Sequence, residues 1–99
     1  MNVIHFETQV IHWRGPSPFF FAPLPKEQAD EISRLSKLVS YGWGMIPVDV
    51  TIGEVEFYTA LFAKDGTYFL PLKDAVRKKI GITAGYTVSV ALTLRPPNR

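Results

Sequence analysis

Apolar residues recur at every second position in three separate segments, and this feature restricts the fold of the chain most strongly. The segments span residues 3–10, 46–61 and 88–94. Successive side chains of a β-strand point to opposite faces, so a period of two predicts strands with one buried face. The alternating apolar residues are Ile4, Phe6 and Val10, then Ile46, Val48, Val50, Ile52, Val55, Phe57 and Leu61, then Val88, Val90, Leu92 and Leu94. A mainly β fold is therefore expected.

Turn residues divide these segments into individual strands. Gly53-Glu54 splits the middle segment into a hairpin, and Asp65-Gly66 supplies the positive φ angles that a second tight turn needs. Tyr68–Pro71 then reads as a short strand. Phe19–Ala22, which lies between prolines, is expected to form a hairpin with residues 3–10. These segments predict about six to seven strands in total.

Two other segments have the period of an α-helix, over residues 26–39 and about 72–80. In each, apolar residues recur at steps of three or four and polar residues fill the remaining positions. Gly81 is typical of the residue that ends a helix, and it marks the end of the second one. The apolar stripes comprise Ala29, Ile32, Leu35, Leu38 and Val39 in the first helix and Leu72, Val76 and Ile80 in the second.

The chain also contains a weak internal repeat. A strand, a proline, a lysine and an acidic residue precede each helix, first in Phe20–Glu27 and again in Tyr68–Asp74. Two similar halves that close one small β-barrel, with a helix capping each end, explain this repeat and leave few open edges. Residues 1–95 are therefore expected to form a single closed barrel domain, and residues 96–99 a frayed tail.

Composition limits the class of protein. The 99 residues suffice for one domain, and 46% of them are hydrophobic, which is well above the level of disordered chains. The absence of cysteine excludes disulfides and thiolate chemistry. No segment reaches the length of apolar sequence that a membrane span needs, so a cytoplasmic protein without membrane contact is expected.

Short motifs spread from Phe6 to Leu94 resemble the bacterial family named domain of unknown function nineteen-oh-five (DUF1905). These motifs are Trp13, Leu24-Pro25, Gly42-Trp43-Gly44, Val48–Gly53, Thr59–Phe62, Leu70–Arg77 and Gly85. The family usually has Asp after the last glycine, where this chain has Tyr86. Any role of that acidic residue is therefore in doubt for this chain, although the fold is not.

The segment Leu70–Gly85 also resembles one half of an AbrB-like transition-state regulator. Leu70-Pro71-Leu72-Lys73, Arg77, Ile80-Gly81-Ile82 and Gly85 follow the order of the AbrB motif. This resemblance implies a double-split β-barrel in which one chain supplies both halves. It does not carry the DNA-binding function with it.

A basic pair and two tryptophans form the candidate binding site. Lys73 and Arg77 are spaced four residues apart on the second helix, so both cations can face one phosphate or carboxylate. Trp13 and the Trp43-Gly44 corner are expected in loops, where the rings can cover an apolar part of a ligand. Two simpler interpretations stay open. Arg77 can pair with Asp74 within the helix, and the tryptophans can plug the barrel ends.

The function predicted from these features is a binding or structural module for a small anionic or amphipathic ligand or a protein partner, present as a monomer or weak homodimer. AbrB-like DNA binding is the first alternative, although the net charge is only +2. An enzyme of unidentified class is the second. No catalytic residue or cofactor is predicted, and His5 and His12 fall on opposite faces of a strand, which disfavours a shared metal.

Overall fold

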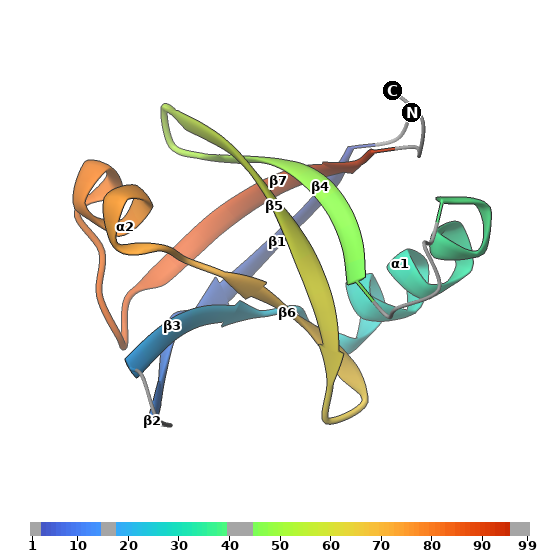
Figure 1. Cartoon of the computed structure of the whole chain (residues 1–99), viewed down its shortest axis with the longest axis horizontal. Helices are drawn as coiled ribbons and strands as arrows, with labels where there is room; N and C mark the ends of the chain where they lie inside the picture. The colour runs from blue at the N-terminus through green and yellow to red at the C-terminus, as the bar shows by residue number, and fades with distance from the viewer. Residues whose placement is uncertain (1–2, 15–17, 40–44, 96–99) are drawn as a thin grey trace.

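The structure is a computed structural model that describes residues 3–14, 18–39 and 45–95 (Figure 1). These residues form seven strands and two helices. In chain order they are β1 (Ile4–Gln9), β2 (Ile11–Arg14), β3 (Pro18–Pro23), α1 (Lys26–Val39), β4 (Met45–Ile52), β5 (Val55–Lys64), β6 (Thr67–Pro71), α2 (Asp74–Ile80) and β7 (Thr87–Leu94). The mainly β prediction is confirmed, as is the span of the first helix.

All seven strands belong to one antiparallel sheet with the order β1-β7-β4-β5-β6-β3-β2. The sheet curls strongly into a half-barrel, with α1 and α2 on opposite sides of the view (Figure 1). The predicted closure of the barrel is not confirmed, because β1 and β2 remain the two edges of the sheet order.

The seam between β1 and β3 shows why no ladder forms there. The hydroxyl of Thr8 donates a hydrogen bond to the carbonyl of Pro23 at 2.5 Å. Proline has no backbone N–H, so Pro23 cannot donate to a strand at this seam. A side-chain bond therefore takes the place of a backbone ladder.

The hairpin predicted between residues 3–10 and Phe19–Ala22 is wrong. β1 pairs with β7, and β3 pairs instead with β2, a strand that the sequence analysis assigned to a loop. The chain changes partners at Val10, whose N–H donates to the carbonyl of Tyr86 and whose carbonyl accepts from the N–H of Gly85. Trp13 consequently lies in a strand and not in a loop.

The core fills the inside of the curl. The alternating apolar residues of β1, β4 and β7 all point inward, together with Leu61, Leu70 and Ala22 from the other strands. Leu61, Leu70 and Ala22 are each 0% exposed. Burying one such aliphatic side chain stabilises the fold by about 1.5–3 kcal/mol, so the period of two that predicted the strands also builds the core.

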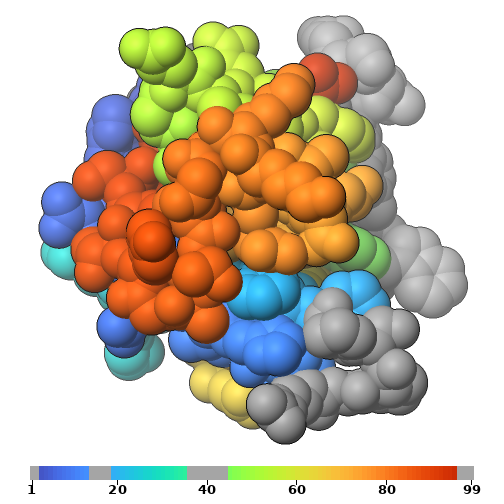
Figure 2. All heavy atoms as spheres, turned by 90° about the vertical axis from the view of Figure 1, so that its left-hand side faces the viewer, coloured from blue at the N-terminus to red at the C-terminus, as the bar shows by residue number. Residues whose placement is uncertain are grey.

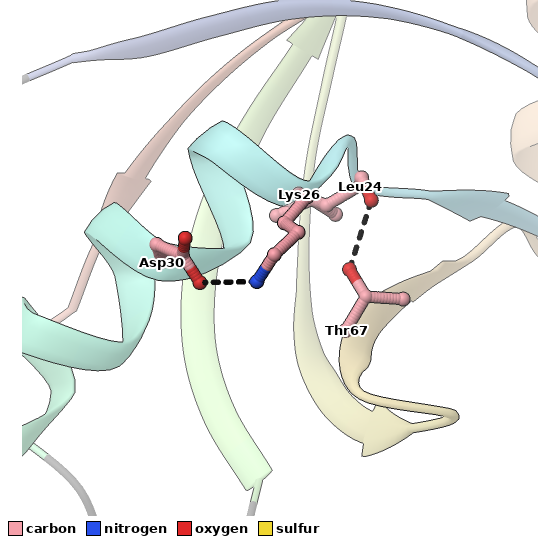
Figure 3. Close-up of polar contacts among 4 residues, drawn as sticks. All are labelled: Leu24, Lys26, Asp30 and Thr67. Carbon is pink, nitrogen blue, oxygen red and sulfur yellow. Dashed lines mark hydrogen bonds and ion pairs between the residues drawn. The ribbon is translucent and has the colours of Figure 1, made fainter.

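The start of α1 is tied to the sheet (Figure 3). The hydroxyl of Thr67, the first residue of β6, donates a hydrogen bond of 2.8 Å to the carbonyl of Leu24. Within the helix the Lys26 ammonium lies 3.5 Å from a carboxylate oxygen of Asp30. Ala29 and Ile32 are buried against the core, as the helical period predicted.

The second helix is shorter than predicted, because it begins at Asp74 and not at Leu72. Leu72 is buried just before the helix, and its N–H donates to the carbonyl of Phe20. This bond ties Leu72 to β3, and Lys73, which follows it, has an extended backbone conformation. Gly81 ends the helix as predicted: it has a φ of 84°, and its N–H donates to the carbonyl of Arg77.

Candidate functional site

Five aromatic residues gather on the outer face of strands β2, β3, β5 and β6. Alternation explains their position, because Ala22, Leu61 and Leu70 face the core and their neighbours in sequence must face outward. Three of the rings pack together, with centroids 5.2 Å apart for Phe21 and Phe62, 5.7 Å for Phe21 and Phe69, and 5.9 Å for Phe62 and Phe69. The remaining two are Trp13 and Phe19. This second apolar cluster lies outside the main core.

Part of this cluster is open to solvent. Trp13, Phe19, Phe21, Phe62 and Lys64 line a hollow of about 180 Å³, which we call the aromatic hollow. Phe21 is only 8% exposed and forms its floor, whereas Trp13 is 42% and Phe19 52% exposed. Large apolar side chains exposed together, and not singly, are typical of interaction sites.

Lys64 supplies the charge of the aromatic hollow. Its ammonium nitrogen lies 4.1 Å from the centroid of the Trp13 ring, within the range of a cation–π contact. Lys64 is the last residue of β5 and its side chain is half-buried. The hollow therefore combines aromatic walls with a cation held in place over one of them.

The predicted basic pair has a different environment from the one expected. The Arg77 side chain is only 16% exposed, and its guanidinium lies 2.5 Å from a carboxylate oxygen of Asp74. The guanidinium carbon also lies 3.6 Å from the centroid of the Phe20 ring. The alternative interpretation, in which Arg77 pairs with Asp74, is confirmed.

Phe20 joins this arrangement to β2. Its ring stacks on the ring of His12, with centroids 4.6 Å apart and planes 19° from parallel. The Nε atom of Arg77 is buried without a hydrogen-bond partner among the described residues. Packing on the Phe20 ring therefore adds to the ion pair with Asp74 in holding the Arg77 side chain.

Lys73 is the residue that immediately precedes α2, and it is exposed. With Phe19, Phe20, Leu72 and Asp74 it lines a second hollow of about 240 Å³. Phe19 therefore separates two neighbouring hollows, one with Trp13 and Lys64 and the other with Lys73. Figure 2 shows this side of the molecule, with β2 and β3 (blue) at the surface below α2 (orange).

The structure thus brings some of the predicted site residues near one another and adds others. Trp13 and Lys73 each line a hollow that includes Phe19. Trp43 and Gly44 lie outside the described residues. Sequence reasoning missed Lys64, Phe21 and Phe62. A signal for Phe21 was present, since three consecutive phenylalanines in one strand cannot all face the core.

A wider and more polar hollow of about 440 Å³ lies on the outer face of β1, β7 and β4. Ser89 donates a hydrogen bond of 3.1 Å to a carboxylate oxygen of Glu7, and His5 lines the same hollow. No group of three or more potential metal-ligating residues occurs within the described part of the chain. No helix among those residues is long and apolar enough to cross a membrane.

The fold and these hollows define a small antiparallel β domain, curled into a half-barrel, with an aromatic hollow on its outer face. The family model described as "Domain of unknown function (DUF1905)" matches residues 6–92. The chain belongs to this family, which confirms the resemblance seen in its motifs. No curated protein matches the chain.

The departure from the family pattern at Tyr86 now has a structural description. The Tyr86 side chain is 51% exposed, while its backbone carbonyl accepts the hydrogen bond from Val10 and its N–H donates to Thr83. The backbone of this residue, and not its side chain, links β1 to the start of β7. A tyrosine is therefore compatible with the fold at this position.

Proposed function

We propose that the protein is a binding module that holds an amphipathic partner at the aromatic hollow. The observation that carries this proposal is the exposure of Trp13 and Phe19 beside a lysine that lies over the Trp13 ring. The proposal keeps Trp13 from the sequence analysis and takes Lys64, in place of Arg77, as the principal cation.

The size of the hollow restricts the ligand. Sites for small molecules and cofactors usually enclose about 300–1,000 Å³, and the aromatic hollow measures about 180 Å³. A hollow of this size suits one ring or one branched aliphatic group. The ligand is therefore a small aromatic or aliphatic acid, or a single side chain of a larger partner.

The charge of the site restricts the ligand further. Lys64 is the charged residue that lines the aromatic hollow, and Lys73 lines the hollow on the other side of Phe19. A carboxylate attached to an apolar group can meet either ammonium group while the apolar part covers Phe19 or Trp13. Such a ligand belongs to the amphipathic class that the sequence analysis predicted.

Titration with 3-phenylpropionate tests the proposal, because this probe joins a ring to a carboxylate. In ¹⁵N-resolved NMR spectra we expect shifts of the Trp13 indole N–H and of the Phe19 and Lys64 amides at millimolar concentration. Trp13→Ala should remove the shifts of the Phe19 and Lys64 amides. Lys64→Gln should weaken the response to phenylpropionate but leave the response to neutral phenylpropanol unchanged.

His5→Ala, in the polar hollow on another face, is the matched control and should leave the titration unaltered. Shifts that gather around His5 and Ser89 instead would overturn the proposal. So would a Trp13→Ala protein that responds as the original chain does.

AbrB-like DNA binding, with the double-split architecture that goes with it, is the second candidate. Exposed Lys73, Lys78 and Lys79 at and near α2 favour it. It requires an affinity for duplex DNA that falls steeply as salt is added. Absence of duplex binding at low salt would exclude it. For either function we propose a cytoplasmic monomer or weak homodimer, in keeping with the lack of cysteine.

A further inference from the structure

The strand that carries Trp13 is an open edge of the sheet. β2 lies at the end of the sheet order, and among the described residues it pairs with β3 alone. In an antiparallel pair, half of the backbone N–H and C=O groups of an edge strand point away from its neighbour. Within the part of the chain that the structure describes, β2 therefore presents backbone groups without a strand partner next to the aromatic hollow.

The other edge of the sheet differs from β2. Along β1 the hydroxyl of Thr8 is bonded to the carbonyl of Pro23, so this edge lies against β3. Figure 2 shows the blue strands β2 and β3 at the molecular surface. Of the two edges, β2 is the one that has no second strand against it among the described residues.

The side chains beside the β2 edge indicate which segment would pair with it. Trp13 and Phe19 are cross-strand partners and lie on the outer face, next to the aromatic hollow. A segment added to β2 would run about 4.8 Å from it, and alternate side chains of that segment would point to the same outer face. One of these side chains would contact the Trp13 ring. The next side chain on the same face, two residues along the segment, would lie beside that ring.

Charge selects the chemistry of the segment. The Lys64 ammonium lies over the Trp13 ring, and the described lining of the aromatic hollow contains no acidic residue. An acidic segment has the complementary charge.

We infer that the partner is an extended acidic-hydrophobic peptide segment that pairs with the β2 edge. Its apolar side chain enters the aromatic hollow, and a carboxylate two residues away meets Lys64. This mode is strand addition, in which backbone hydrogen bonds supply affinity and side-chain pockets supply specificity. The inference rests on the proposed function, because it names the partner class for the same hollow.

The test uses the whole chain and an acetylated, amidated peptide of sequence Thr-Thr-Leu-Thr-Glu-Thr-Thr, in which Leu and Glu are two residues apart. We expect amide shifts along residues 11–14 and at least tenfold slower hydrogen exchange of the unpaired β2 amides. Two further peptides are N-methylated at alternate residues, one at the odd and one at the even positions. One of the two should bind at least tenfold more weakly, because its N-methyl groups replace the N–H donors of the ladder.

Side-chain selectivity is tested in parallel. Replacing the Glu of the peptide by Lys should weaken its binding to the original protein at least fivefold. The Lys64→Gln protein should bind the Glu and Lys peptides equally. A peptide with Gln in place of Glu should bind the original protein and the Lys64→Gln protein equally. Trp13→Ala should remove binding of all these peptides. The ¹⁵N spectrum of each variant reports whether its fold is retained.

Each failure has a distinct meaning. Strand addition is overturned if phenylpropionate binds at Trp13 but the peptide does not. It is also overturned if both N-methylated peptides bind as well as the parent peptide. In either case the proposed function stands. If neither probe binds, both are overturned. A dimer that Trp13→Ala dissociates, seen by analytical ultracentrifugation, would assign the β2 edge to a second copy and overturn the inference.

Discussion

The inner and outer faces of the same strands differ in what their apolar residues do. On the inner face, Leu61 and Leu70 are 0% exposed and belong to one continuous core. On the outer face, their neighbours Phe62 and Phe69 join a cluster whose margin, at Trp13 and Phe19, is open to solvent. Apolar content alone thus does not distinguish residues that stabilise the fold from residues available for binding.

The largest expected effect lies in the inner face. Leu61→Ala removes a side chain from the centre of the core and leaves a cavity, so the free energy of unfolding should fall by about 3–5 kcal/mol. Urea unfolding followed by circular dichroism measures this change. A loss below about 1 kcal/mol would mean that the inside of the half-barrel is not the principal core.

The floor of the aromatic hollow should show an intermediate effect. Phe21 is 8% exposed and its ring contacts those of Phe19, Phe62 and Phe69. Phe21→Ala should lower the free energy of unfolding by about 2 kcal/mol, less than in the core because solvent can enter the space that is left. Equality with Phe19→Ala in the same urea experiment would show that the outer cluster has no packed interior.

The seam between β1 and β3 should respond less than either face. Thr8→Val keeps the shape of the side chain but removes the hydrogen bond to Pro23. A net loss of about 1 kcal/mol is expected, together with faster hydrogen exchange in β1. Unchanged exchange in β1 would show that packing alone holds this edge against β3.

The smallest effect on stability is expected at the margin of the aromatic hollow. Phe19 is 52% exposed, so Phe19→Ala should change the free energy of unfolding by no more than about 0.5 kcal/mol. The same variant should lose most of its response to phenylpropionate. A large loss of stability with intact binding would reverse the assignment of the two faces.

Much of the fold could be predicted from local patterns. Strands β1, β4, β5 and β7 follow the period of two and helix α1 the period of 3.6, and Gly81 ends α2 as expected. β2 escaped detection because the alternation of Ile11, His12 and Trp13 covers only three residues, shortly before a glycine and two prolines. Its strand conformation results from pairing with β3, which is a tertiary effect.

The candidate site was less predictable than the fold. Lys73 and Arg77 stood out because they are close in sequence, yet the structure commits Arg77 to Asp74 and to the Phe20 ring. Lys64 drew no attention because its partner, Trp13, is far away in the sequence. Spacing along a helix reports shared faces but not the neighbours that other elements bring to that face.

By itself, the sequence of this protein determined most of the strands, both helices and which residues of each alternating strand share a face, since these follow from the backbone geometry of a single segment. Only the tertiary structure decided that β1 pairs with β7, that β2 is an edge, and that Trp13, Phe19 and Lys64 meet. Pairing and register depend on how the whole sheet twists and curls, and contacts between distant segments come into being only when that curl forms.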